Sequence, residues 1–366
     1  MTDSPGDACP CGDPAAEAVA FWGRAAGPPG GSRREHLGRK TGGVPNVGTP
    51  RPPATYMEPE HLRSHTVPVD AHGREDTDRT STTEPTTTSG TAAEPDLGPT
   101  GRPRRPVPEP VPLSTHGPAR IIAMCNQKGG VGKTTSTINL GASLAEYGRR
   151  VLLVDLDPQG ALSAGLGVAH HDLDLTVHNL LVEPRVSTDD VLVRTHVEGL
   201  DLLPSNIDLS AAEIQLVSEV GREQALGRAL YPMLDRYDYI LVDCQPSLGL
   251  LTVNALACAD SVLIPMECEF FSLRGLALLN DTVAKVRDRL NPKLAVAGIL
   301  VTMFDQRTLH GREVMSRVVE VFGDLVYDAV INRTVKFPET SVAGEPITRW
   351  RPPPPAPSRT APSRGK

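Results

Sequence analysis

The chain has 366 residues, a formal net charge of −7 and only 4% aromatic residues. It contains no stretch of about 20 apolar residues, which excludes a membrane-spanning helix, and its first residues lack the basic and then apolar layout of a signal peptide. Its 6 cysteines suggest no disulfide framework in a chain of this length. These features predict a cytoplasmic protein without a membrane partner.

Proline is distributed unevenly along the chain. Of the 35 prolines, 20 lie in residues 1–118 and 6 in residues 352–362, which leaves 9 for the long stretch between. A segment rich in Pro, Gly and Thr with little apolar periodicity cannot bury enough surface to offset the entropy of ordering it. We therefore expect a disordered tail at 1–118, one globular domain at 119–348, and a basic, proline-rich tail at 349–366.

Within 119–348, short apolar runs alternate with helical patterns. The first run, 121–125, precedes a glycine-rich turn and a helix that ends near Gly148. Further strands are predicted at 151–155, 200–204, 239–243, 261–265 and 296–303, and further helices at 210–234, 272–290 and 311–322. Continuous apolar strands alternating with helices predict an α/β fold, a mostly parallel sheet with helices on both faces. In such sheets ligands bind at the carboxyl ends of the strands.

The turn after the first strand has the sequence of a phosphate-binding loop. A strand, a glycine-rich turn and a helix occur in the order that a P-loop requires, so backbone N–H groups and the helix N-terminus can surround an anionic phosphate chain. The predicted nucleotide-binding residues are Gly129, Gly130, Val131, Gly132, Lys133, Thr134 and Thr135. The usual pattern has a glycine where this chain has Gln127, and a second lysine, Lys128, follows it. A plain tight turn or a dinucleotide-binding loop would not need both lysines.

Aspartates follow two of the predicted strands. Asp155 and Asp157 come after the strand at 151–155, and Asp243 ends the strand at 239–243. A triphosphate needs Mg²⁺, which takes oxygen ligands, so we expect the metal at Thr134, Asp243 and Asp155, with Asp157 free to orient a water molecule. Aspartates at strand ends can also serve only as helix caps.

The loop with two lysines resembles the deviant Walker A loop of the ParA/MinD family of ATPases. The segments 155–160, 237–254, 264–275, 302–308 and 333–339 are similar to motifs of its Soj/ParA branch. This resemblance implies a P-loop NTPase fold, ATP and Mg²⁺ as cofactors, and a slow ATP hydrolase that dimerises on ATP. It also implies binding to DNA without sequence preference, localisation at the nucleoid, and chromosome or plasmid partitioning with a ParB-like partner that stimulates hydrolysis.

The resemblance also implies a role for each matching residue. Lys128 would contact the nucleotide of the partner protomer, Lys133 the β and γ phosphates, and Asp157 the attacking water. Dimerisation would therefore complete the catalytic site. The basic residues that match the DNA-binding side of this branch are Arg307, Arg333 and Lys336.

Two alternatives stay open. A MinD-like membrane-associated regulator would need a C-terminal amphipathic helix, which the run Pro352–Pro355 disfavours. A nucleotide-binding scaffold with impaired hydrolysis is disfavoured by Asp157, but the altered C-terminal end keeps it open. Many relatives have proline where this chain has Gln245 and Asn332. Relatives also continue after Thr348 into a closing helix that has no counterpart in this sequence, so we expect apolar surface of the sheet to be uncovered there.

Overall fold

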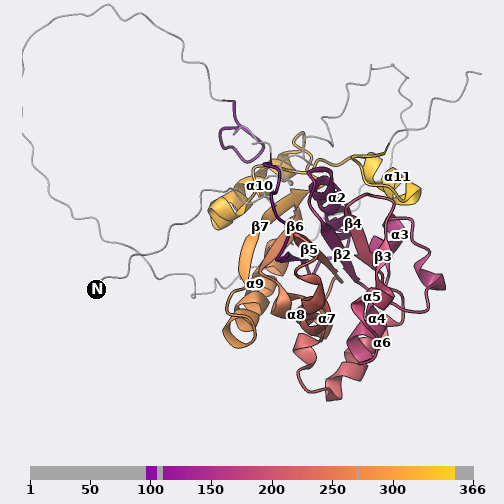
Figure 1. Ribbon diagram of the computed structural model, residues 1–366. Helices are drawn as coiled ribbons and strands as arrows, with labels where there is room; N and C mark the ends of the chain where they lie inside the picture. Colours follow the sequence, from indigo (N-terminus) through magenta and orange to yellow (C-terminus); the bar gives the residue numbers. More distant parts are fainter. Residues whose placement is uncertain (1–95, 105–109, 270–271, 351–366) are drawn as a thin grey trace, which may run out of the picture. The chain divides into compact units, whose positions relative to one another are not determined.

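The computed structural model describes residues 96–104, 110–269 and 272–350, which form a mostly parallel sheet with helices on both faces (Figure 1). This confirms the predicted fold class. The predictions made for residues 1–95 and 351–366 lie outside the described residues.

Among the described residues the sheet has seven strands in the order β3-β4-β2-β5-β1-β6-β7. Neighbouring strands are parallel except β3 and β4, which are antiparallel. The strands are β1 (Arg120–Met124), β2 (Val151–Leu156), β3 (Val193–Arg194), β4 (Leu200–Leu203), β5 (Tyr239–Cys244), β6 (Ser261–Glu267) and β7 (Ala295–Thr302). The six strands predicted from apolar runs are all present, with small differences at their ends. Because β1 lies between β5 and β6, the loop that follows β1 emerges at the middle of the carboxyl edge.

Successive strand residues face opposite sides of the sheet, which divides the core in two. In β2, Leu152 and Val154 belong to one apolar cluster, and Val151 and Leu153 to the other. The first face packs against α4 (Val177–Val182), α5 (Thr188–Val191), α6 (Leu209–Gln215), α7 (Ala225–Leu230), α8 (Leu250–Cys258), α9 (Ser272–Arg289) and α10 (Leu309–Phe322). The second face packs against α2 (Lys133–Glu146), α3 (Ala161–Gly165) and α11 (Lys336–Ala343).

The helix predicted at 210–234 is wrong as a single element. The structure has α6, two short 3₁₀ turns at Leu216–Ser218 and Arg222–Gln224, α7, and a third turn at Tyr231–Met233. Gly221 adopts a φ of 67°, a left-handed conformation that cannot continue a helix. Ile214 and Val217, in the first half of the expected helix, are 78% and 60% exposed.

The residues described before the expected boundary at 118 form specific contacts with the rest of the chain. Arg102 donates from Nη1 to the Val326 carbonyl over 2.9 Å and forms an ion pair with Asp328 over 3.2 Å. Thr100 donates to the same carboxylate over 3.0 Å, and Gly117 donates to Asp238 over 3.0 Å. Specific hydrogen bonds of this kind, rather than apolar burial, attach 96–104 and 110–118 to the sheet, which is why composition did not predict them.

The sheet face near the C-terminal end of the described chain is covered. Leu263 and Leu300, which face that side, are 0% and 1% exposed. A Cβ placed on Gly298 would lie 2.7 Å from the Tyr327 ring, so this ring covers β7 directly. The expectation of an uncovered sheet is therefore wrong at these strands.

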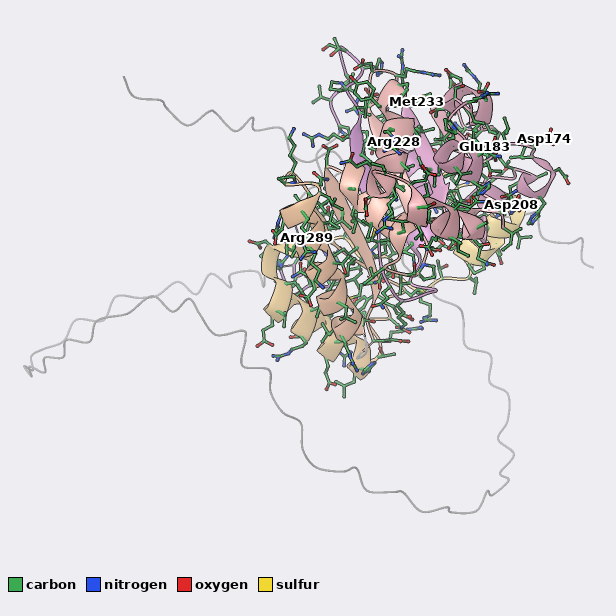
Figure 2. The ribbon with its side chains drawn as sticks, turned by 90° about the horizontal axis from the view of Figure 1, so that it is seen from below. Asp174, Glu183, Asp208, Arg228, Met233 and Arg289 are labelled. Carbon is green, nitrogen blue, oxygen red and sulfur yellow. The ribbon has the colours of Figure 1, made fainter. Side chains whose placement is uncertain are left out.

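None of the helices in the described part of the chain is both long enough and apolar enough to cross a membrane. Seen from below, Arg289 at the end of α9 lies on the opposite side of the molecule from Glu183 and Asp208 (Figure 2).

Candidate nucleotide-binding site

The P-loop occupies the carboxyl edge of the sheet between β1 and α2. Gly130 and Gly132 have φ values of 74° and 81°, which only glycine adopts without strain. The Asn126 amide braces the loop, since it donates to the Pro265 carbonyl over 2.7 Å and accepts the Lys128 backbone N–H over 2.9 Å. On the other side the Thr302 hydroxyl donates to the Val131 carbonyl over 2.8 Å. The loop is therefore tied to both β6 and β7.

Lys133 opens α2 and its side chain lies over the loop. Its Nζ donates to the Lys128 carbonyl over 3.1 Å, and the residue is only 6% exposed. Burial lowers the pKa of this ammonium, while the nearby Asp243 carboxylate opposes that shift. A buried ammonium group that donates to a neutral carbonyl is stabilised when an anion binds beside it. A phosphate can supply that negative charge.

Thr134 and Asp243 meet at the end of β5. The Thr134 hydroxyl donates to Asp243 Oδ2 over 2.6 Å. Asp243 is fully buried, and burial together with the charge of Asp155 raises the pKa of its carboxyl to about 8. A hydroxyl and a carboxylate side by side are hard oxygen donors of the kind that Mg²⁺ binds. The assignment of these two residues as metal ligands stays a prediction.

Asp155 and Asp157 are placed differently from each other. Asp155 is fully buried, and its Oδ2 accepts from the backbone N–H of Ser163 over 2.9 Å and from its hydroxyl over 2.7 Å. Burial raises the pKa of Asp155 to about 6. Oδ2 is therefore committed to α3, whereas Oδ1 accepts only the Asp157 backbone N–H over 3.3 Å, so a bond from Asp155 to a metal would use Oδ1. Asp157 is half-buried, and its Oδ1 accepts only the Gln159 N–H, over 3.0 Å.

The residues at this edge fit a nucleotide with Mg²⁺. A Cβ placed on Gly130 would meet no atom within 4 Å, so the space beside this part of the loop is open. No three His, Cys, Asp or Glu side chains of the described residues form a metal cage by themselves. Mg²⁺ would take its remaining ligands from phosphate oxygens and water, as it usually does. Thr135, farther along α2, is half-buried and accepts the Asn139 amide through its carbonyl.

The side chain of Lys128, the second lysine of the loop, is paired with two carboxylates. Its Nζ lies 3.4 Å from Glu267 Oε2, and it also binds the carboxylate of Glu269. Glu267 in turn accepts Arg333 Nη2 at its other oxygen over 2.6 Å. Both glutamates lie in the segment 264–275 that resembles a motif of the Soj/ParA branch, but the sequence alone assigned no role to either of them.

Two of the three predicted DNA-binding residues come together at the same edge. Phe304 and Asn332 form a parallel bridge, and the Arg333 N–H donates to the Phe304 carbonyl over 3.1 Å, so Arg307 and Arg333 lie on adjacent segments. Arg307 binds Asp305 through Nε and Nη2 over 2.9 and 2.8 Å and holds the pKa of that carboxyl to about 2. Lys336 begins α11, where its backbone N–H donates to Thr334.

The described cysteines are not arranged for surface chemistry. Cys125 and Cys244 follow β1 and end β5, with their sulfur atoms 3.3 Å apart beneath the loop, and both are buried. The hydrogen bond from Cys125 and burial raise the pKa of the Cys244 thiol well above its usual range. Cys268 is buried and Cys258 half-buried. Three of these four thiols are therefore buried.

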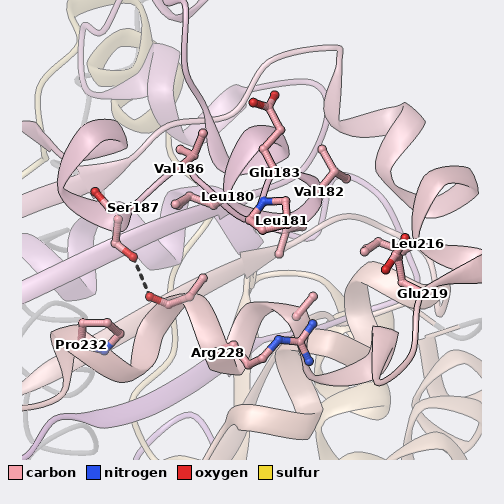
Figure 3. Close-up of a pocket in the computed structure, with 14 residues that line it drawn as sticks. Leu180, Leu181, Val182, Glu183, Val186, Ser187, Leu216, Glu219, Arg228 and Pro232 are labelled. Atoms are coloured by element: carbon pink, nitrogen blue, oxygen red, sulfur yellow. Dashed lines mark hydrogen bonds between the residues drawn. The ribbon is translucent and has the colours of Figure 1, made fainter.

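A hollow that is separate from the P-loop lies among the helices on the first face of the sheet. A cavity of about 390 Å³ is enclosed between α4, α5 and α7 and lined by side chains that include Leu180, Leu216, Arg228 and Pro232 (Figure 3). The Thr188 hydroxyl donates to the Ala229 carbonyl across it over 2.6 Å. No predicted site residue lines this cavity, so we do not assign the nucleotide to it.

Comparisons with known proteins agree with this geometry. A family model described as an AAA domain matches residues 119–296. The chain is 48% identical to the sporulation initiation inhibitor protein Soj of Bacillus subtilis, over 64% of this chain and 92% of Soj. It is 45% identical to the chromosome partitioning protein ParA of Caulobacter vibrioides, over 63% of this chain and 86% of ParA.

A solved structure is similar as well. Cobyrinic acid a,c-diamide synthase from Mycobacterium smegmatis, with a bound ATP analogue and magnesium, is 44% identical with a TM-score of 0.57. The match covers 62% of this chain and 91% of that structure. With a P-loop of this geometry and relatives matched over nearly their whole length, the chain belongs to the ParA/Soj family of P-loop ATPases.

Proposed function

We propose that this protein is an ATP-dependent dimerising ATPase that binds DNA without sequence preference and acts in partitioning with a ParB-like protein. The observation that carries the proposal is the gathering of two lysines, Thr134, Asp243 and Asp157 at one edge of the sheet. Arginines that can face DNA phosphates lie at the same edge.

In this proposal ATP and Mg²⁺ bind at the P-loop. The N–H groups from Gly129 to Thr135 surround the phosphates, and Lys133 exchanges the Lys128 carbonyl for a phosphate oxygen. Thr134 and Asp243 hold Mg²⁺, which offsets the charge that develops during phosphoryl transfer. Asp157 has a free carboxylate oxygen with which to orient the attacking water.

Lys128 supplies the reason for a dimer. It lies at the outer rim of the loop, with 35% of its side chain exposed, whereas Lys133 already serves the protomer's own phosphates. A lysine at this rim can reach a nucleotide in a facing copy. Hydrolysis would then be slow in one protomer and faster in the dimer, because transition-state charge stabilisation depends on groups already in place.

The proposed DNA contact follows from Arg307 and Arg333, whose side chains are 82% and 61% exposed. Both are paired with carboxylates in the single protomer, so DNA phosphates must compete with Asp305 and Glu267. The net charge of −7 confines any attraction to a local patch.

A salt titration with and without nucleotide tests the proposal. Binding to a fluorescent DNA duplex of arbitrary sequence is measured with ATP, with ADP and with no nucleotide. We expect ATP to strengthen binding, and the logarithm of the affinity to fall linearly with the logarithm of salt concentration. If ATP leaves DNA affinity unchanged across the series, the partition function is wrong. Location at the nucleoid depends on the same ATP-dependent DNA binding, so it fails if that binding fails. The same assay with a ParB-like protein added tests whether this partner releases the ATPase from DNA.

A second candidate is amide synthesis, because a structural relative of 44% identity carries the name cobyrinic acid a,c-diamide synthase. The test is ATP consumption with cobyrinic acid and an ammonia donor, followed by mass spectrometry of the product. DNA-stimulated hydrolysis without any amide product favours partitioning, and the reverse result favours the synthase. A scaffold with impaired hydrolysis would bind ATP and DNA in the first assay but release no phosphate. A MinD-like regulator would bind anionic vesicles rather than DNA.

A further inference from the structure

Glu267 lies where the P-loop and the basic segments meet. It is the last residue of β6 and pairs with Thr302 of β7, the residue that binds the Val131 carbonyl of the loop. Its side chain is 13% exposed. The position of this carboxylate is therefore fixed by the sheet rather than by a loose surface chain.

The two oxygens of Glu267 bind two different cations. Oε2 lies 3.4 Å from Lys128 Nζ, and Oε1 lies 2.6 Å from Arg333 Nη2. Glu269 binds the Lys128 ammonium as a second acceptor. Partial burial alone would lower the pKa of Lys128, yet the hydrogen bonds and charges of Glu269 and Glu267 raise it. The same contact holds the pKa of Glu269 below its usual range.

We propose that Glu267 and Glu269 form a carboxylate clamp that holds Lys128 in the single protomer and competes for it with the phosphates of a partner's nucleotide. The inference rests on the proposed function, in which Lys128 contacts the facing protomer. One ammonium cannot serve both sets of anions, so each protomer opens its clamp when the dimer forms. Glu267 and Glu269 are positioning residues, since they act on the nucleotide only through Lys128.

Arg333 adjusts the strength of the clamp. Arg333 and Lys128 both bind the Glu267 carboxylate, and each cation weakens the interaction of the other with this shared anion. Removal of Arg333 leaves Glu267 to Lys128 alone, which tightens the clamp and opposes dimerisation. Removal of Glu267 has the opposite effect. The two substitutions thus differ in sign, and the effect of Arg333 on dimerisation passes through Glu267.

The test is sedimentation velocity of the full chain with Mg²⁺ and a non-hydrolysable ATP analogue, over a range of protein concentrations. Exposed ion pairs change an equilibrium by about two- to fivefold, and a dimer opens two clamps, so Glu269→Gln should tighten the dimer by about 4- to 25-fold. Glu269→Asp keeps the carboxylate and should stay near the wild type. The matched control is Glu320→Gln, which removes an exposed pair with Arg317 on α10 and should change nothing.

A double-mutant cycle separates the clamp from a general effect of charge near the nucleotide. Arg333→Gln should weaken the dimer, and this effect should vanish in the Glu267→Gln background. Additive effects of the two substitutions overturn the inference. If the wild type dimerises but Glu269→Gln behaves like Glu320→Gln, the clamp is wrong while the proposed function stands. If the wild type stays a monomer with the analogue at every concentration, the proposed dimer fails and the clamp with it.

Discussion

Thr302 joins β7 to the P-loop through one buried hydrogen bond, and its replacement by valine tests how much that bond contributes. The hydroxyl donates to the Val131 carbonyl over 2.8 Å, and the two residues are 3% and 0% exposed. Valine keeps the shape and removes the donor, so a buried carbonyl is left unpaired at a cost of about 1–3 kcal/mol. In a domain of this size each kcal/mol lowers Tm by about 2–4 °C, so Thr302→Val should lower Tm by about 2 to 12 °C.

The assay is a circular-dichroism melt of wild type, Thr302→Val and Thr302→Ser, with ATP affinity measured alongside. Because the loop loses one of its two braces, we expect ATP to bind Thr302→Val up to about tenfold more weakly. Serine keeps the hydroxyl, so its Tm and affinity should stay closer to those of the wild type. If Thr302→Val melts with the wild type while Thr302→Ser melts at a lower temperature, methyl packing rather than the hydrogen bond carries the effect, and the reasoning is refuted.

Three further predictions concern the same edge. Asp157→Ala should slow phosphate release and prolong the ATP-dependent complex with DNA; hydrolysis at the wild-type rate would remove Asp157 from the proposed water-orienting role. Gly160→Ala should lower the free energy of unfolding by about 1–3 kcal/mol more than Gly148→Ala does, and should therefore have the lower Tm. Both glycines have positive φ, 62° and 75°, but a Cβ on Gly160 would lie 2.4 Å from the His170 ring, whereas one on Gly148 meets nothing within 4 Å; equal melting temperatures contradict this. Arg333→Ala should reduce the slope of log affinity against log salt by about 0.9, and an unchanged slope argues against a phosphate contact at this residue.

The central parts of the site were predictable because they are local in sequence. A strand, a glycine-rich turn and a helix within 121–148 determine the P-loop without reference to the rest of the chain. Asp155 and Asp243 were predictable as well, because apolar runs mark the strands that place them at one edge. Their different surroundings were not predictable, since the contact of Asp155 with Ser163 depends on where α3 begins.

Contacts between distant residues left no comparable signal. Lys128 and Glu267 are 139 residues apart, and Thr302 and Val131 are 171 apart, and no periodicity relates either pair. The helix expected at 210–234 failed for a similar reason, because a regular spacing of apolar residues continues across Gly221 although its backbone does not. In the proline-rich segment before residue 118, the single side chain of Arg102 forms contacts that composition does not reveal.

The strand order has a consequence for how this protein folds during synthesis. The loop leaves the sheet between β5 and β6, and Thr134 can contact Asp243, 109 positions later in the chain, only after that residue has been synthesised. Loop closures of that length slow folding, so the first strand and its helix must wait, partly unpaired, for most of the domain to emerge from the ribosome. Until then the ATP-binding site is incomplete. ATP can therefore stabilise only those chains in which β5 and β6 have already paired with β1.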